Sequence, residues 1–174
     1  KKIKSLYTQM PTHYRDSDHN NQIKEFKNLV NYSKNDWDKN QILNKLLLNS
    51  GGLVDWREFY LTEEELIKLV KLGMEIGSHS HSHKLLSNLT PEEQYQEIKL
   101  THDFLSDLLG KEPNKFCYPY GRPISYNKTT LSILKEFSYH MGVSVENSEI
   151  SHDDIINRPL ELPRFDCNSY FKDK

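Results

Sequence analysis

The 174-residue sequence contains no alanine and only two cysteines, and its formal net charge is −2. Cys117 and Cys167 are too few for a disulfide framework and lack the spacing of a metal finger. We therefore expect two buried free thiols, with one long-range disulfide as the alternative. The near-neutral charge gives no electrostatic reason to expect nucleic acid as a partner. Because no apolar run approaches roughly 18 residues, we expect no membrane span.

The start of the chain, Lys1-Lys2-Ile3-Lys4, lacks both the apolar stretch of a signal peptide and an initiator methionine. This leaves localisation open between the cytoplasm and export, and it allows for residues that once preceded Lys1. The length suits one structural domain with one core. The oligomeric state is not indicated by the sequence.

The first third of the chain has apolar residues at helical spacing and no strong strand pattern. We predict helices near residues 1–10, 23–30 and 36–47, followed by a turn at 49–52. Residues 1–60 are therefore interpreted as a helical insertion or cover.

Helices and strands are expected to alternate from residue 61 to residue 165. Capping boxes at Thr62 and Thr90 predict two helix starts, and Gly73 and Gly110 predict the corresponding ends. A further helix is expected at 127–137, and residues 146–157 are expected to form a polar loop. The predicted strands are 74–77, 115–118, 141–145 and 160–165. This alternation favours a parallel α/β layer or barrel.

Three histidines lie close together after the short apolar segment at 74–77. Imidazole is a common zinc ligand. His79 and His83 would share a face on one helical turn, whereas His79 and His81 would share a face at the end of a strand. A solvated histidine-rich loop is the third interpretation. His102 lies among apolar residues on a predicted helix and is interpreted as a core histidine.

Three segments, taken in order, resemble the polysaccharide deacetylase family, also called the NodB-homology domain or carbohydrate esterase family 4. Glu75-Ile76-Gly77-Ser78-His79-Ser80-x-x-His83 resembles its histidine motif. Phe116-Cys117-Tyr118-Pro119-Tyr120-Gly121 resembles its Tyr-Pro-Tyr-Gly motif, and Leu162-Pro163-Arg164-Phe165-Asp166 resembles a late strand segment. The resemblance implies a deformed (β/α) barrel of the NodB-homology type, incomplete at its N-terminus, with 61–174 as its C-terminal part.

The resemblance also implies a function. That function is metal-dependent N-deacetylation of an N-acetylated amino sugar or polysaccharide, a hydrolysis of a carbon–nitrogen bond, with zinc as the usual metal. By position, the metal ligands would be His79 and His83, and Ser80 would hydrogen-bond to hold the loop and a histidine in place. The backbone N–H of Tyr120 would stabilise the oxyanion, and Arg164 would orient the catalytic base. Tyr118 and Pro119 would shape the sugar pocket.

One family motif has no counterpart before His79. The family carries Thr-Phe-Asp-Asp at the end of an early strand, where the two aspartates act as base and metal ligand. The pair Asp153-Asp154 lies in a predicted loop and is an unfavoured substitute. We favour a deacetylase whose first catalytic strand lies outside this chain. The alternative is a catalytically degenerate carbohydrate-binding or assembly module of the same fold.

Overall fold

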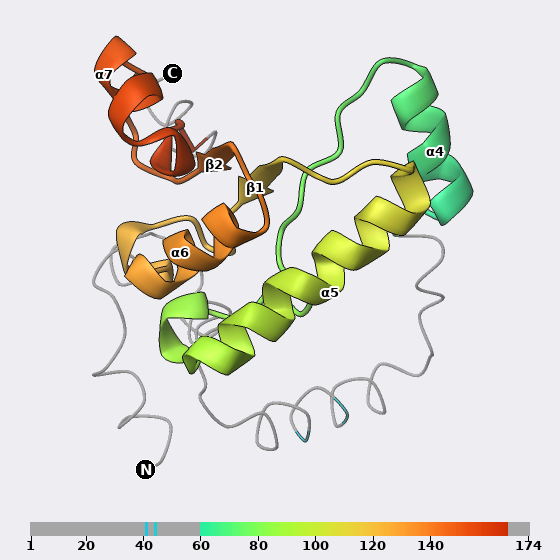
Figure 1. Ribbon diagram of the computed structural model, residues 1–174, viewed down its shortest axis with the longest axis horizontal. Coiled ribbons are helices and arrows are strands. Elements are labelled where there is room, and N and C mark those ends of the chain that lie inside the picture. Colours follow the sequence, from blue (N-terminus) through green and yellow to red (C-terminus); the bar gives the residue numbers. More distant parts are fainter. Residues whose placement is uncertain (1–40, 42–43, 45–59, 167–174) are drawn as a thin grey trace. The chain divides into compact units, whose positions relative to one another are not determined.

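A computed structural model describes residues 41, 44 and 60–166 (Figure 1). By its internal contacts the chain divides into two units, Lys1–Phe59 and Tyr60–Lys174. The helices predicted at 1–10, 23–30 and 36–47 lie outside the described residues, apart from Gln41 and Asn44, which are helical. The role of residues 1–60 as an insertion or cover stays a prediction.

The described elements are, in order, α4 (Glu63–Lys71), η3 (Leu86–Asn88), α5 (Pro91–Leu109), β1 (Lys115–Cys117), η4 (Pro123–Ser125), α6 (Lys128–Glu136), β2 (Met141–Val143), α7 (His152–Asn157) and η5 (Pro159–Glu161).

Helices α4 and α5 begin at the predicted capping boxes. The side chains of Thr62 and Thr90 each accept a hydrogen bond from the backbone N–H three residues on, and the glutamate there accepts one from the N–H of the threonine. Gly110 ends α5 in the left-handed conformation, with a φ of +65°. The helix predicted at 127–137 is confirmed as α6, which begins after Asn127. No helix in the described part of the chain is both long and apolar enough to cross a bilayer.

Four segments run parallel to one another and follow the order of the chain. Ser78 bridges to Phe116 of β1, β1 pairs in parallel with β2, and Val143 of β2 bridges to Leu162. Helix α5 connects the first two segments and α6 connects β1 to β2 (Figure 1). Parallel segments in sequence order with helical crossovers are the repeating unit of a (β/α) barrel, and these residues form an arc of one.

The extended segments are shorter than predicted. Residues 74–77 are not a strand, because only Ser78, the next residue, joins the parallel arc. The strand predicted at 160–165 is also wrong. Its beginning belongs to the 3-10 turn η5, and its pairing is confined to Leu162. Pro163 follows directly and has no N–H to continue a ladder of hydrogen bonds.

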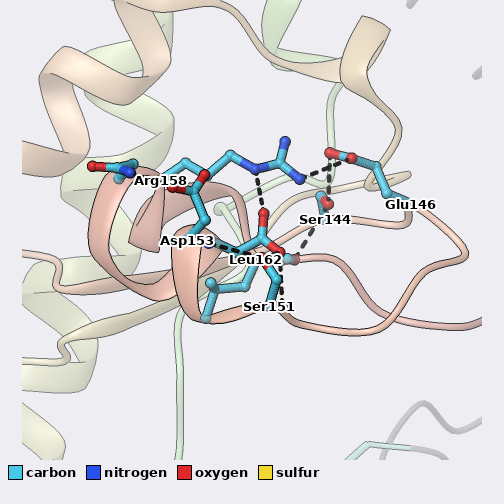
Figure 2. Close-up of polar contacts among 8 residues, drawn as sticks. Ser144, Glu146, Ser151, Asp153, Arg158 and Leu162 are labelled. Carbon is cyan, nitrogen blue, oxygen red and sulfur yellow. Dashed lines mark hydrogen bonds and ion pairs between the residues drawn. The ribbon is translucent and has the colours of Figure 1, made fainter.

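The prediction of a polar loop at 146–157 is wrong in its second half, where residues His152–Asn157 form the short helix α7. Ser151 is its N-cap and accepts from the N–H of Asp154, while the Asp154 carboxylate accepts from the N–H and hydroxyl of Ser151 at 2.8 and 2.7 Å. The guanidinium of Arg158 donates to Asp154 at 2.6 Å and to Glu146 at 3.4 Å (Figure 2). Aspartate thus does at this helix start what glutamate does in the usual capping box.

The core lies between the parallel arc and helices α5 and α6. Its centre is aromatic, and Tyr118 stacks on Tyr126 with ring centroids 3.9 Å apart. His102 is buried beside Phe137 and Tyr139, which confirms its interpretation as a core histidine. The buried hydrophobic residues of this cluster are Leu86, Ile98, Phe116, Tyr118, Tyr126, Ile133, Leu134, Tyr139 and Leu160.

We expect the contribution of Asp154 to stability to depend on pH. The hydrogen bonds from Ser151, and after them the one from Arg158, lower the pKa of Asp154 from 3.8 to about 2. A lowered carboxyl pKa stabilises the fold fully above the unfolded-state value, and this stabilisation is lost as the pH falls toward the folded-state value. Asp154→Asn should therefore lower the urea midpoint at neutral pH, and the gap to the wild type should narrow as the pH falls from 3.8 to about 2.

Asp153→Asn is the matched control for this measurement. It removes the same charge from the same helical turn, but Asp153 is exposed and accepts from the side chain of Asn157. Its effect on the urea midpoint should be small. If the urea midpoints of the wild type and Asp154→Asn differ as much at about pH 3 as at neutral pH, the lowered pKa of Asp154 does not account for the stabilisation.

Candidate active site

The candidate site is built from three loops that follow three of the four parallel segments. Ser78 leads into residues 79–83, β1 leads into residues 118–121, and Leu162 leads into Arg164. Because the segments are parallel, their carboxyl ends lie at the same edge, which is where α/β folds bind ligands. Three motifs that are far apart in the sequence are thereby brought to one edge of the arc.

His79 is held through one of its two ring nitrogens. Its Nδ1 lies 2.6 Å from the backbone oxygen of Cys117. A carbonyl oxygen only accepts, so Nδ1 carries the proton and donates, which leaves the lone pair on Nε2. The hydrogen bond with the Cys117 side chain raises the pKa of His79, although burial and the charge of Arg164 oppose this. Nε2 is therefore the atom that His79 can offer to a metal.

His83 lies between the rings of His79 and Tyr120. Its ring centroid is 4.9 Å from each, and both contacts are edge-to-face, with interplanar angles of 67° and 63°. Two imidazoles this close can present nitrogen atoms to one ion. The two predicted ways of bringing histidines together, a helical turn and a strand end, are both wrong, because residues 79–83 form an irregular loop.

The backbone of both loops is in an unusual conformation. Ser80, His83 and Tyr120 have φ angles of +60°, +54° and +64°, and they are three of the four non-glycine residues with positive φ in the described part of the chain. The left-handed region costs such a residue about 1–2 kcal/mol. Conformations of this kind persist only where the surrounding structure imposes them, and they are frequent at functional sites.

The histidine loop is hydrogen-bonded to a residue that the sequence analysis missed. The carboxylate of Glu97, on α5, accepts from both the N–H and the hydroxyl of Ser82. Glu97 is buried, with 8% of its surface exposed. The signal that could have found it is its position one residue before Ile98 on the buried face of α5, where a charged side chain needs polar partners.

The hydrogen bonds predicted for the Ser80 side chain are not seen among residues 60–166, and its role in holding a histidine stays a prediction. Its side chain is buried, and its hydroxyl has no hydrogen-bond partner among residues 60–166. It therefore makes no hydrogen bond to either histidine in the described structure. The hydroxyl that anchors the loop belongs to Ser82 instead.

Tyr118 and Pro119 lie beneath the site rather than on its surface. Both are fully buried, and the Tyr118 hydroxyl donates to the backbone oxygen of Leu160 at 2.5 Å. Burial raises the pKa of the Tyr118 hydroxyl well above its ordinary value. The structure gives both residues a place in the core, and their contact with a substrate stays a prediction.

Arg164 lies close to Cys117, which is a free, half-buried thiol. Burial would raise the pKa of Cys117, but the hydrogen bond from His79 and the charge of Arg164 outweigh it and lower the pKa. Cys117 has a free thiol in the structure, but it is half-buried rather than buried as predicted, and Cys167 lies outside the described residues. The expected orientation of a catalytic base by Arg164 remains a prediction.

The two histidines fit half of a zinc site. Neutral imidazole is a usual zinc ligand, and the Nδ1 contact of His79 is the orienting hydrogen bond that such ligands commonly make. Within the part of the chain that the structure describes, no three side chains of His, Cys, Asp or Glu gather where they could hold an ion. Asp153 and Asp154 do not act as substitutes, since Asp154 bonds to the N-cap of α7 and Asp153 accepts from Asn157 at the end of that helix.

A cavity of about 410 Å³ lies away from the three loops. Its lining includes His140, which precedes the amino end of β2, and Arg158 and Leu160. The candidate site lies at the opposite, carboxyl ends of the parallel segments. This cavity therefore takes no part in the candidate site.

The sequence pattern of the polysaccharide deacetylase family matches residues 21–142, which is most of the chain. The chain belongs to the polysaccharide deacetylase family. This confirms the resemblance to the NodB-homology domain of carbohydrate esterase family 4, and the matched residues include the His79 and Tyr120 segments but not the Arg164 segment. It also confirms the predicted fold class, since the parallel arc with its helices is part of the α/β fold of that family.

Individual members of the family support this assignment. The chain is 32% identical over 94 residues to YxkH of Bacillus subtilis, a match that covers 54% of this chain and 33% of that protein. It is 40% identical over 58 residues to the peptidoglycan-N-acetylmuramic acid deacetylase PdaC of the same organism, covering 33% and 12%. Among solved structures, the deacetylase PplD of Streptococcus pyogenes, in complex with acetate, matches with a TM-score of 0.56 and 28% identity, covering 68% of this chain and 48% of that one. The chain thus spans a third or less of these two curated relatives.

Proposed function

We propose that this member of the polysaccharide deacetylase family removes N-acetyl groups from an amino sugar in a carbohydrate polymer, in a metal-dependent reaction. The observation that carries the proposal is the pair of adjacent imidazoles of His79 and His83 beside Tyr120. Deacetylation is proposed as the reaction because the relatives include a peptidoglycan deacetylase. Zinc is the metal that best fits two neutral imidazoles.

His79 and His83 would hold the metal, and each has a distinct support. The N–H at Nδ1 of His79 donates to the Cys117 carbonyl, which fixes both the tautomer and the orientation of the ring. The ring of His83 packs between those of His79 and Tyr120. When bound, zinc lowers the pKa of a water to about 7 and polarises a carbonyl oxygen.

Tyr120 would act through its main chain. Its left-handed conformation, with a φ of +64°, turns the peptide at the carboxyl edge of the arc next to His83. A backbone N–H at such a position can donate to the oxyanion that develops on an acetyl carbonyl. Arg164 adds a positive charge near Cys117 and His79.

The proposal is tested by measuring zinc content and acetate release in the purified protein. We expect about one zinc per chain by elemental analysis and acetate release from N-acetylated oligosaccharides or peptidoglycan. A chelator should abolish the release and added zinc should restore it. Activity unchanged after complete metal removal would overturn the metal dependence.

A negative result distinguishes the alternative function. Saccharide binding with bound zinc, but without acetate release from any N-acetylated carbohydrate, would overturn deacetylation. That result would favour the carbohydrate-binding module as the function of the chain.

A further inference from the structure

We infer that Glu97 is a positioning residue, which holds the loop of residues 79–83 in the conformation that brings His79 and His83 together. The inference rests on the proposed metal-dependent function. Glu97 lies on α5, and its role is not implied by the motifs of the histidine loop itself.

Three hydrogen bonds join Glu97 to the middle of this loop. The Glu97 carboxylate accepts from the backbone N–H of Ser82 at 2.8 Å through one oxygen and from the Ser82 hydroxyl through the other. The backbone oxygen of Glu97 accepts from the N–H of His81 at 3.1 Å. His81 and Ser82 lie between the two histidines, so the bonds fix the centre of the segment that separates them.

The Glu97 carboxylate and the histidine loop depend on each other, because the carboxylate is buried. A carboxylate that is only 8% exposed needs hydrogen bonds to both oxygens, and Ser82 supplies them. The loop in turn needs the carboxylate, because Ser80 and His83 are in the left-handed region and the Ser80 hydroxyl has no partner in the described part of the chain. Without Glu97, the loop would lose the contacts that hold these unfavourable backbone angles.

The anchor itself is rigid. Helix α5 runs for 19 residues from a capping box to Gly110, and Ile98, next to Glu97, is fully buried in the core. The position of Glu97 is thus set by the core and not by the loop. The side chain and the backbone oxygen of Glu97 thus connect the rigid helix α5 to the segment between His79 and His83.

The decisive measurement is zinc affinity by competition with a chromogenic chelator, in the whole protein. Glu97→Ala should weaken zinc binding by about 10- to 100-fold, which is typical for loss of a group that orients metal ligands. Glu97→Gln keeps the size of the side chain and one acceptor oxygen, so its zinc affinity should lie between those of Glu97→Ala and the wild type. It also provides a folded protein to measure if Glu97→Ala does not fold.

Gln94→Ala is the matched control. Gln94 is also buried on α5, one turn earlier, but it donates to the backbone of Leu89 at 3.1 Å and accepts from Thr130 at 2.6 Å. Its loss should lower stability without changing zinc affinity. Unchanged zinc affinity in both Glu97 variants, or an equal loss in Gln94→Ala, would overturn the inference.

Amide hydrogen exchange of the metal-free protein separates this inference from the proposed function. Glu97→Ala should speed exchange at Ser82 selectively, while amides in the middle of α5 keep their protection. If the wild type binds no zinc, the metal-dependent function fails. The exchange data then still decide about Glu97: selective loss of protection at Ser82 supports the anchor, and unchanged protection there overturns it.

Discussion

His79→Ala is expected to lower zinc affinity and the rate of acetate release by at least about a hundredfold. The change removes one of the two imidazoles that the structure brings together, whose ring centroids are 4.9 Å apart. Loss of a group that merely orients a metal ligand already costs 10- to 100-fold, so loss of a ligand should cost at least as much. Zinc content by elemental analysis and acetate release are the two measurements.

His81→Ala is the control for this prediction. It removes an exposed imidazole from the same loop and leaves the backbone N–H that donates to Glu97. Zinc content and activity should stay close to those of the wild type. Normal zinc content and activity in His79→Ala would contradict the assignment of the site, whatever the result for His81.

Gly142→Ala is expected to destabilise the protein by about 3 kcal/mol, the upper end of the usual cost of overpacking a core. Gly142 is the central residue of β2, and its backbone oxygen accepts from the N–H of Leu162 at 2.8 Å. A Cβ atom there would lie 2.7 Å from the carbonyl carbon of Leu160, closer still to its oxygen, and 2.9 Å from the Tyr118 hydroxyl. Backbone atoms cannot move aside as a flexible side chain can.

Gly110→Ala makes the same chemical change where space is available. A Cβ at Gly110 meets no atom within 4 Å, but the φ of +65° makes alanine unfavourable by about 1 kcal/mol. Both variants restrict the unfolded chain equally, so the difference in their unfolding free energies is the steric cost at Gly142 less the cost of the left-handed conformation at Gly110. Urea denaturation measures it, and equal free energies would contradict the close approach at Gly142.

The helices with local start and stop signals could be predicted from the sequence. The capping boxes at Thr62 and Thr90 and the end at Gly110 are short-range patterns, and each is decided by residues within one turn. Helix α7 was not predicted, because the usual capping box has glutamate or glutamine at its third helical position and this helix has Asp154 there. Asp154, which is also a carboxylate, makes the same bonds to Ser151.

The strands were less predictable because their pairing is not local. Residues 74–77 have an apolar character that suits a strand, yet only Ser78 reaches a partner, on β1. At the other side of the arc, Pro163 limits the pairing of its segment to Leu162. Whether an apolar stretch pairs depends on which residues lie beside it, and the sequence does not show that directly.

Some residues of the candidate site could likewise be found from the sequence, and others only from the structure. Residue type and spacing pointed to the histidine segment but left His79 with His83 and His79 with His81 as alternative pairs, and the resemblance to the family selected His79, His83 and Tyr120. The sequence did not identify the hydrogen bonds that hold the histidine loop. They were predicted for Ser80, and in the structure they join Ser82 to Glu97. Neither Ser82 nor Glu97 carries a motif.

The sequence by itself determined that this chain belongs to the polysaccharide deacetylase family and where its main helices begin, and it placed three imidazoles in one short segment. Those properties depend on side-chain chemistry and on contacts within a few residues. Only the tertiary structure decided that the histidine loop is irregular, that the Nδ1 proton of His79 is donated to Cys117, and that Glu97 holds the loop from α5. These depend on contacts between residues 15 and 38 positions apart, which form only when the parallel arc and its helices pack together.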